Sequence, residues 1–533
     1  MQTPHTYFPT RPPAARLVER IFNPLDTLCN RLYGSRYNPL YQSGTIAVLS
    51  LLVLLVTGLY LLWFYKIGAP YESVTNIEAQ WWGGRLIRAV HVYAGDVMMV
   101  AVAVHALRMA LRGRTWGPRV LAWISGVVLV SIVMMSSITG MVLVWDVQGQ
   151  LLAIEGARMA DTLPIFSEPI QRTFISSQGV PASFFFLNLI LHMVFPFAIL
   201  IGLWVHTLRV SRPALLPPRK LSAWLLVALL GVSLAYPAGM LPPADYLTIL
   251  GRVPVDWINT FWLLVSRNVP PPVTLLSGLA LFLFLVSVPW WWKPRLAAHP
   301  EPARANPNLC TGCTQCYKDC PYGAISMVPA PPSNHATDIV ALINPALCVS
   351  CGICAGSCGP MVVGPPGRVG RDHLLAAQRL MTAAAPGAED IVLMACEQGL
   401  GLEPVLAGLP HVTVHRLHCA AAVHTSAMEY LLRRGCGGVY VLACPERDCA
   451  YREGPRWLRE RLYEDREAEL QPRVDKRRVK MGGFGPADLP QALADIGAFQ
   501  ADIAALAHEA RDEGDVQLEP DCEPMPLAEV AHG

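Results

Sequence analysis

The chain has 533 residues, of which 53% are hydrophobic and 15% are charged. A positive mean hydropathy excludes an ordinary soluble protein and predicts a membrane protein, while the length leaves room for soluble domains as well. The formal net charge of +2 neither favours nor excludes any class of binding partner.

The N-terminal segment, residues 1–36, is polar, Pro-rich and Arg-bearing. We expect no separate secretory signal, because the first apolar stretch is too long for the apolar region of a signal peptide. Six apolar stretches then follow, each of about 20 residues or more, which is enough to cross about 30 Å of hydrocarbon. They predict six transmembrane helices at 43–65, 88–110, 119–145, 185–208, 221–241 and 273–292.

Basic residues gather before the first predicted span and after the second, fourth and sixth. Those after the spans include Arg112, Arg114, Arg119, Arg209, Arg212, Arg219, Lys220, Lys293 and Arg295. The positive-inside rule therefore places the N-terminus and everything after residue 293 in the cytoplasm. Cysteine usage agrees, since Cys29 lies in the N-terminal segment and the other fourteen cysteines follow residue 309. A reducing compartment keeps such thiols free for metal ligation.

Two of the apolar stretches each contain a pair of histidines, His91 with His105 and His192 with His206. Fourteen residues separate the members of each pair, which is nearly four helical turns, so both members share a helix face about 21 Å apart. Two such helices packed together predict two stacked haems, each held by two histidines. The alternative is that each histidine is simply a satisfied polar group within the membrane.

Pairs of glycines repeat the same interval in two further stretches: Gly44 with Gly58, and Gly126 with Gly140. Small residues let helix backbones approach their neighbours closely, and a flat macrocycle needs such a gap at each tier. Ordinary helix packing is the alternative. Four helices with one common spacing favour the haem interpretation.

This region resembles cytochrome b of the respiratory cytochrome bc complexes, over about residues 36–292. The sequence "RAVH" at 88–91 is similar to the Arg-x-x-His of that family, and "HALR" at 105–108 to its second His-x-x-Arg. The sequence "GMVLVW" at 140–145 resembles its Gly-Tyr-Val-Leu-Pro-Trp, and Pro196 follows His192 by four residues, as in the family.

The resemblance implies two b-type haems. His91 would pair with His192 on the outer-side haem, and His105 with His206 on the inner-side haem. Arg88 and Arg108 would meet haem propionates, a role that suits the planar guanidinium group.

A predicted outer loop, "PVDWINTFWLLVSRNVP" at 254–270, resembles the quinol-site segment of cytochrome b, whose hallmark is Pro-Glu-Trp-Tyr. Asp256 stands in place of the glutamate, and Trp257 matches the tryptophan. A carboxylate beside an apolar cleft could pass the protons of a quinol to the aqueous phase. The alternative is an interfacial helix with a solvated aspartate. Asp96, in mid-span, receives no predicted role.

Several parts of the family are missing. Only six spans are predicted, so the last two helices of a full cytochrome b are absent, and no Rieske or cytochrome c segment is found. The inner-side quinone site of the family is not visible either. These features argue against a complete Q cycle.

Two runs of the form Cys-x2-Cys-x2-Cys-x3-Cys follow a Pro-rich linker, the first starting at Cys310 and the second at Cys348. They resemble bacterial two-cluster ferredoxins, in which the fourth cysteine of each run binds the other cluster. One [4Fe-4S] cluster would then bind Cys310, Cys313, Cys316 and Cys358, and the other Cys348, Cys351, Cys354 and Cys320. Structural zinc is the alternative, but it favours paired cysteines over runs of four.

Three short β-rich runs further along each end in a cysteine: "DIVLMAC", "VTVHRLHC" and "GGVYVLAC". In open α/β sheets, ligands gather beyond the carboxyl ends of the strands. We therefore expect Cys396, Cys419, Cys444 and Cys449 to converge at one edge, where four thiolates suffice for a [2Fe-2S] cluster. Buried structural cysteines are the alternative. Cys29, Cys436 and Cys522 receive no role.

This part resembles the delta, iron-sulfur subunit of methyl-viologen-reducing hydrogenase, most closely in "GGVYVLACPERDCAYREG" at 437–454. The family often has a further cysteine where this chain has Gly399. The resemblance implies electron exchange with the flavin (FAD) subunit of a heterodisulfide-reductase-like complex, itself fed by a dehydrogenase or hydrogenase module or a similar donor.

The sequence thus predicts a multi-domain fold: an all-α transmembrane six-helix cytochrome b bundle, an α+β two-[4Fe-4S] ferredoxin domain, and an α/β open-sheet [2Fe-2S] domain. The expected limits are a cytoplasmic segment at 1–36, the bundle at 37–293, a linker at 294–304, the ferredoxin domain at 305–366, the [2Fe-2S] domain at 386–510 and a disordered acidic tail at 511–533.

The predicted function is electron transfer in a bacterial or archaeal cytoplasmic membrane. In chain order, electrons would pass between a quinone, two b haems, two [4Fe-4S] clusters, one [2Fe-2S] cluster and a cytoplasmic flavoprotein, in either direction. A homodimer is compatible with this prediction, and no basic-aromatic patch for nucleic acid is present. The alternatives are a truncated bc-type quinol oxidase serving an outer-side acceptor, and a membrane redox sensor or docking scaffold.

Overall fold

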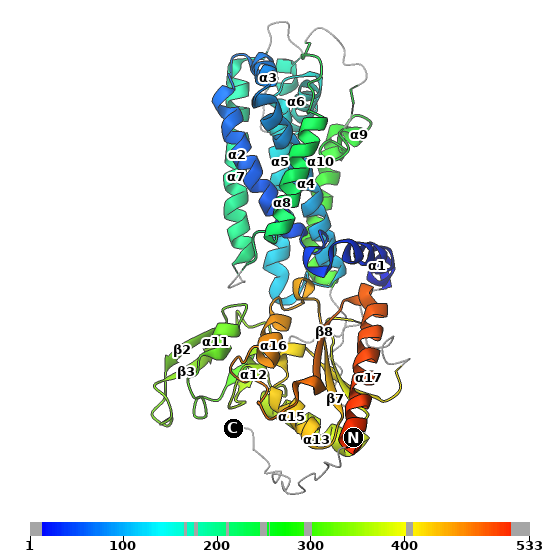
Figure 1. Ribbon diagram of the computed structural model, residues 1–533. Helices are drawn as coiled ribbons and strands as arrows, with labels where there is room; N and C mark the ends of the chain where they lie inside the picture. Colours follow the sequence, from blue (N-terminus) through cyan, green and yellow to red (C-terminus); the bar gives the residue numbers. More distant parts are fainter. Residues whose placement is uncertain are drawn as a thin grey trace.

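The computed structural model describes residues 13–164, 168–174, 180–208, 213–245, 253–254, 256–292, 301–400 and 409–512. Sequence predictions on Arg209, Arg212, Lys293, Arg295, Cys522, most of the linker and nearly all of the acidic tail lie outside these residues. A bundle of long helices stands on a second part that contains all the named strands (Figure 1).

Five helices of the described part are long and apolar enough to cross a membrane. They are α2 (Ser43–Phe64), α4 (Gly84–Leu111), α5 (Val120–Val142), α7 (Ala182–Thr207) and α10 (Pro271–Trp291).

The predicted span at 221–241 corresponds to α8 (Arg219–Ala235), which has only 17 residues and is therefore about 26 Å long. This helix ends early because Tyr236 precedes Pro237, and a residue before proline is pushed out of the helical conformation. The region is thus a helical bundle as predicted, with five helices of full length and one shorter helix.

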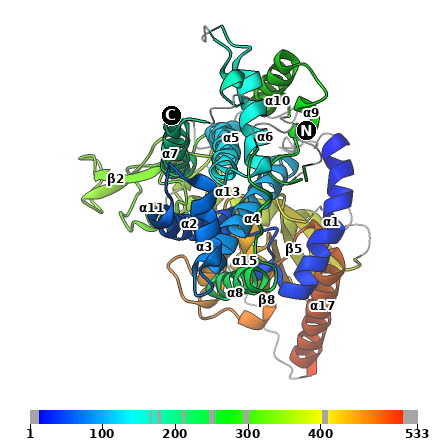
Figure 2. The ribbon, with the colours of Figure 1, turned by 90° about the horizontal axis from the view of Figure 1, so that it is seen from above.

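The long helices pack as two pairs, α2 against α4 and α5 against α7 (Figure 2). Their shared core contains Leu51, Met98, Val133 and Ile199. Many large apolar side chains face outward instead; Trp63, for example, is 86% exposed. An apolar outer surface of this kind suits contact with lipid.

Shorter elements close both ends of the bundle. They are α1 (Pro13–Tyr33), η1 (Ser35–Tyr37), α3 (Pro70–Ala79), η2 (Gly117–Arg119), α6 (Val147–Ala160), η3 (Ile170–Phe174) and α9 (Leu263–Ser266). Helix α1 lies at the end next to the second part, where Asn30 Nδ2 donates to Asp488 Oδ1 over 2.8 Å. Thr27 Oγ1 also donates to the Ala487 carbonyl. The polar N-terminal segment thus connects the two parts.

The first section of the second part contains β1 (Arg304–Ala305), α11 (Gln315–Asp319), β2 (Ile325–Pro329), β3 (Ile339–Ile343), α12 (Ile353–Gly356) and β4 (Val363–Gly364). Strand β1 pairs antiparallel with β4, and β2 pairs antiparallel with β3. The β2–β3 hairpin projects sideways from the rest of the molecule in both views.

The remaining section contains α13 (Gly370–Ala384), β5 (Ile391–Cys396), β6 (Val412–Leu417), η4 (Ala420–Ala422), α15 (Thr425–Arg433), β7 (Gly438–Ala443), η5 (Glu446–Asp448), α16 (Gly454–Tyr463), η6 (Lys476–Arg478), β8 (Val479–Gly483), η7 (Pro486–Asp488) and α17 (Leu489–Asp512). Its four strands form a parallel sheet in the order β6-β5-β7-β8. The predicted β-rich runs are β5, β6 and β7. Strand β8 was not predicted, because glycines weaken a strand pattern.

Apolar side chains cover both faces of this sheet, and Ile391, Leu393 and Tyr440 pack under Phe499 and Ile503 of α17. Because β5, β6 and β7 run parallel, the residues that follow them meet at one edge. That edge carries the cysteines considered below.

Candidate redox centres

Two pairs of histidines face each other across the bundle, one member on α4 and the other on α7. The imidazole centroids of His91 and His192 are 6.4 Å apart, and those of His105 and His206 are also 6.4 Å apart. An imidazole nitrogen binds a transition metal at about 2 Å and lies roughly 1 Å in front of its ring centroid, so two rings on one metal ion are roughly 6 Å apart. The spacing at both tiers fits one iron between two imidazoles.

The glycines at the predicted interval lie against these rings. A Cβ atom added at Gly140 would be 2.8 Å from His192 Cε1, and one added at Gly44 would be 2.9 Å from His105 Nδ1. The corresponding distances are 3.3 Å from Gly58 to His91 Cε1 and 3.2 Å from Gly126 to His206 Cε1. Each glycine therefore makes room for an imidazole, and larger residues would displace it.

Hydroxyl groups contact three of the four rings at Nδ1. Thr57 Oγ1 is 2.8 Å from His91 Nδ1, Thr139 Oγ1 is 3.2 Å from His192 Nδ1, and Ser125 Oγ is 3.1 Å from His206 Nδ1. A contact at Nδ1 fixes the ring and leaves Nε2 for a metal. The sequence analysis missed these residues, although a Ser or Thr directly precedes each of the four glycines.

The two predicted propionate-binding arginines have protein partners. Arg88 donates to Glu78 and to the carbonyl of Ala238. Arg108 forms ion pairs with Asp26 (2.8 Å) and Asp448 (2.9 Å), and its buried Nε has no hydrogen-bond partner among the described residues. The propionate role of both arginines stays a prediction.

Arg108 belongs to a buried group of cations that joins the bundle to the second part. Arg112 and Arg114 also contact Asp448, with N to O distances of 3.7 and 3.1 Å. Burial raises the pKa of the Asp448 carboxyl, but the three arginines outweigh this effect and hold it below its usual value. Asp448 is next to Cys449, so the bundle holds the loop that carries a predicted cluster ligand.

The structure brings the two cysteine runs of the ferredoxin-like section together. Cys358, Cys310 and Cys313 lie close enough to Cys316 to raise the pKa of its thiol. We name these four the distal ferredoxin site. Cys348 likewise lies close enough to Cys320 and Cys351 to raise the pKa of their thiols. These three cysteines and Cys354 form the proximal ferredoxin site.

Burial makes these thiols weak acids when no metal is bound. It raises the pKa of both Cys316 and Cys351 to about 12, and neighbouring thiolates contribute to the shift. Cysteine binds metal as the thiolate, so cluster binding would have to offset this cost. No disulfide bond joins two cysteines in the described part of the chain.

The predicted cysteines of the parallel sheet also converge, and we name them the four-cysteine site. Cys396 Sγ is 3.6 Å from Cys444 Sγ. A Cβ atom added at Gly454 would be 3.3 Å from Cys419 Sγ and 3.6 Å from Cys449 Sγ. All four cysteines are at most 6% exposed.

Cys436 lies at the opposite end of the sheet, where its Sγ donates to the Gly438 carbonyl. It therefore takes no part in the four-cysteine site. Among the described residues, no group of three or more His, Cys, Asp or Glu side chains is placed to hold a single metal ion. The cysteines of an iron-sulfur cluster bind several different iron atoms.

Asp256 of the predicted quinone segment is half-buried and joined to Asp96. Its Oδ1 accepts hydrogen bonds from the backbone of Ile258 and Asn259. Asn259 Nδ2 donates to both Asp256 Oδ2 (2.9 Å) and Asp96 Oδ1 (2.8 Å). Trp257 is 71% exposed. The link between Asp256 and Asp96 was not predicted, since 160 residues separate them in the chain.

Three family models match the chain in sequence order. They are cytochrome b/b6/petB over residues 29–213, the 4Fe-4S dicluster domain over 309–360, and the methyl-viologen-reducing hydrogenase delta subunit over 405–507. The chain is therefore a fusion of these three kinds of segment, as the sequence motifs predict.

A curated relative, cytochrome b6 of Gloeobacter violaceus, is 26% identical over 157 residues, which are 29% of this chain and 73% of the relative. A solved structure described as a hyperthermophilic respiratory Complex III is 18% identical with a TM-score of 0.39, and the match covers 47% of this chain and 75% of that one. With its cytochrome b segment, iron-sulfur segments and apolar helices, the chain is a multi-pass membrane electron-transfer subunit.

Proposed function

We propose that this chain moves electrons between the membrane quinone pool and a cytoplasmic flavoprotein, as the membrane subunit of a quinone-linked oxidoreductase complex. The observation that carries the proposal is the continuity of its sites. Two histidine tiers cross the bundle, and the buried Arg108–Asp448 pair joins the end of the second tier to the four-cysteine site.

His91 with His192, and His105 with His206, would each hold one b-type haem. The ring spacing of 6.4 Å and the glycine beside each ring support this assignment. The distal and proximal ferredoxin sites would each hold a [4Fe-4S] cluster, and the four-cysteine site a [2Fe-2S] cluster. When bound, these groups carry single electrons, while the protein positions them and excludes water.

Asp256 would accept a proton from a quinol at the end of the bundle away from the second part. Its bonds to the backbone and to Asn259 fix one orientation of the carboxylate. Asn259 also holds Asp96, so a second carboxylate lies within one side chain of the first. Two carboxylates joined in this way suit the release of the two protons of a quinol.

The resemblance to the hydrogenase delta subunit supports a flavin (FAD) subunit of a heterodisulfide-reductase-like complex as the soluble partner. Orientation follows from the basic loops: Arg112, Arg114 and Arg119 lie at the end of the bundle that contacts the second part. Under the positive-inside rule this end faces the cytoplasm.

The test is rapid-scan spectroscopy of the purified anaerobic protein with a short-chain quinol, or with a reduced viologen as a cytoplasmic-side donor. Both donors should reduce the same b-type haems, and Asp256→Asn should slow only the quinol reaction, by about 10²-fold or more. If neither donor reduces the haems, a docking scaffold is the better interpretation. If quinol reduces the haems but never the clusters, the truncated quinol oxidase is the better interpretation.

A further inference from the structure

The three cysteine sites follow a different order in space than in the chain. Cys351 of the proximal ferredoxin site lies in one buried cluster with Cys419 and Cys449 of the four-cysteine site. Contact is close, because a Cβ atom added at Gly352 would be 2.9 Å from the Ala422 Cβ. The proximal site is therefore the neighbour of the four-cysteine site.

The distal ferredoxin site belongs to a second buried cluster, which also contains Cys354 of the proximal site. Cys310, Cys316 and Cys358 pack there with Ile325 and Val340 of the β2–β3 hairpin. This hairpin projects away from the helical bundle (Figure 1). The distal site is therefore the one furthest along the series from the four-cysteine site.

The four-cysteine site is next to the membrane bundle. Asp448 and Ala450, on either side of Cys449, accept bonds from Arg108, Arg114 and Arg119 of the bundle. Its four cysteines are almost completely buried, so a partner protein cannot touch them.

We infer that the four-cysteine site passes electrons between the haems and the ferredoxin sites. Electrons then enter or leave the chain at the distal ferredoxin site, where a redox protein with a basic surface docks. The inference rests on the proposed function and deepens it. Chain order and the resemblance to the delta subunit would instead place the four-cysteine site at the partner.

The surface beside the distal site is accessible. Cys313 is only partly buried, and its neighbours Leu309 and Tyr317 are 48% and 51% exposed. An exposed apolar pair beside a redox site offers the kind of contact that a docking protein covers.

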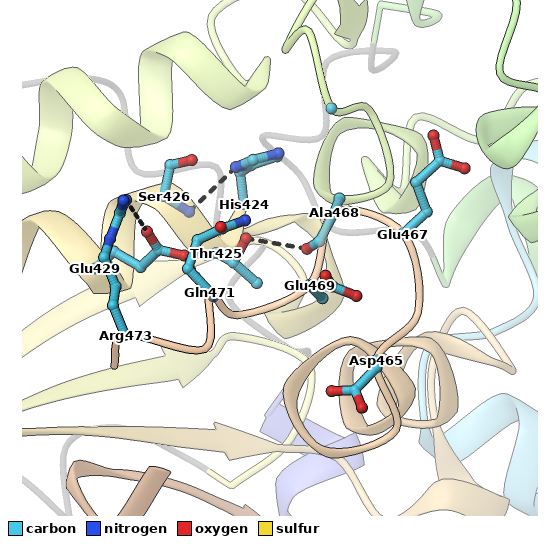
Figure 3. A pocket seen from close by; sticks show the side chains of 11 residues that line it. His424, Thr425, Ser426, Glu429, Asp465, Glu467, Ala468, Glu469, Gln471 and Arg473 are labelled. Atoms are coloured by element: carbon cyan, nitrogen blue, oxygen red, sulfur yellow. Dashed lines mark hydrogen bonds and ion pairs between the residues drawn. The ribbon is translucent and has the colours of Figure 1, made fainter. Parts of the chain in front are cut away.

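An open cavity of about 600 Å³ adjoins the same site (Figure 3). It begins at Gly359, directly after Cys358, and Glu467 on its wall contacts Cys313. His424 lies on another wall; it is 5% exposed, and its Nε2 has no hydrogen bond of ordinary geometry to any described residue. The backbone of Cys358 interacts with this histidine, so the cavity wall reaches the distal site.

Carboxylates dominate the cavity wall. Glu429 is paired with Arg473 on one side of the cavity (Figure 3). Asp465 is paired with Lys476, which does not line the cavity. Glu467 and Glu469 have no ion-pair partner in the described part of the chain, and both line the cavity. Lysine or arginine side chains of a partner would complement these two charges.

The exchange at this surface is one electron per encounter. The reduced distal site would lose one electron and return to its oxidised form, while the partner's cofactor gains that electron. A quinol supplies two electrons and releases two protons, so two encounters balance one quinol.

The test uses the complete chain with its haems and clusters, and cytochrome c as a small lysine-rich probe. A carbodiimide that joins carboxylates to lysine amines without a spacer is added at low ionic strength, and crosslinked peptides are identified by mass spectrometry. We expect crosslinks in the tryptic peptide from Glu467 to Arg473, which contains both unpaired glutamates.

The matched variants are Glu467→Gln/Glu469→Gln and, as a control, Asp502→Asn/Glu509→Gln, two exposed residues on the outer face of α17. After reduction with stoichiometric dithionite, the first pair should lower the rate of electron transfer to ferric cytochrome c about tenfold at low salt. The difference should vanish near 1 M salt, where charges are screened within about 3 Å. The control should behave as the unaltered chain.

Crosslinks elsewhere on the chain, or equal rates for the two variants at low salt, would overturn the docking surface. Neither result would contradict the proposed function, which is tested separately by quinol reduction of the haems. Conversely, haems that quinol cannot reduce would remove the function and leave the crosslink map unchanged.

The order of the sites is tested by electron paramagnetic resonance after freeze-quenching with quinol. Cys313→Ala, which disrupts only the distal site, should leave the four-cysteine site reducible through the haems. Cys396→Ala should instead isolate both ferredoxin sites. The opposite pattern would restore the chain order and overturn the inference.

Discussion

The glycines beside the histidines offer the sharpest test of the two haem tiers. In Gly140→Ala the new Cβ would be 2.8 Å from His192 Cε1, whereas carbon atoms rest at about 3.5–4.0 Å. The ring must therefore move by roughly 0.7 Å, while a metal-ligand distance tolerates only about 0.2 Å. Loss of ligand positioning of this kind costs about 10–100-fold in metal affinity. We expect haem loss at the His91/His192 tier alone.

The control is Gly95→Ala on α4, where an added Cβ meets nothing within 4 Å. Alanine stabilises a helix by up to about 1 kcal/mol relative to glycine, so helix propensity alone would favour both variants. Haem is counted per polypeptide by the pyridine haemochrome assay, and the tier is identified by redox titration. We expect one haem per chain in Gly140→Ala and two in Gly95→Ala. Two haems in both would refute the tier geometry.

The spacing also predicts a graded series. Gly44→Ala, with a contact of 2.9 Å, should empty the other tier, whereas Gly58→Ala at 3.3 Å should keep its haem with a shifted potential. Equal effects of these two variants would mean that the distances to the rings do not control binding.

Three further outcomes follow from buried polar contacts. Asn259→Leu breaks the link to Asp96 and should slow quinol-dependent haem reduction at least tenfold, while reduction by viologen is unchanged. Burial lowers the pKa of His373 to about 3, so the neutral imidazole contributes stability that is complete above pH 6.5 and is lost as the pH falls towards 3. Thermal unfolding, followed by the loss of iron-sulfur absorbance, should therefore show about 2 kcal/mol less stability at pH 5 than at pH 7.5. His373→Gln should reduce this difference. Asp448→Asn leaves Arg114 without its buried partner, at a cost of about 3–5 kcal/mol, and hydrogen exchange in the Cys449 loop should rise.

Local spacing predicted the features that depend on it. The fourteen-residue interval of the histidines, the two cysteine runs and the strand-terminal cysteines each follow from a helix turn, a loop motif or a strand end. Contacts between distant segments left no such pattern. Arg108 and Asp448 are 340 positions apart, and nothing beside either residue indicates the other. Pro237 indicates in the sequence that α8 ends near Ala235, but the span was predicted from hydropathy alone and was therefore extended to residue 241.

The buried ion pairs between the bundle and the Cys449 loop position the sites more than they stabilise the fold. Removing charges from water costs several kcal/mol per ion, so such pairs add little net stability even though breaking one is costly. Their geometry is nevertheless specific, because Arg108 follows His105 by three residues on α4 and Asp448 precedes Cys449 directly. One ion pair therefore fixes the second histidine tier relative to the four-cysteine site. The inferred order of electron transfer depends on such contacts in space, because they hold the last domain of the chain against the end of the bundle.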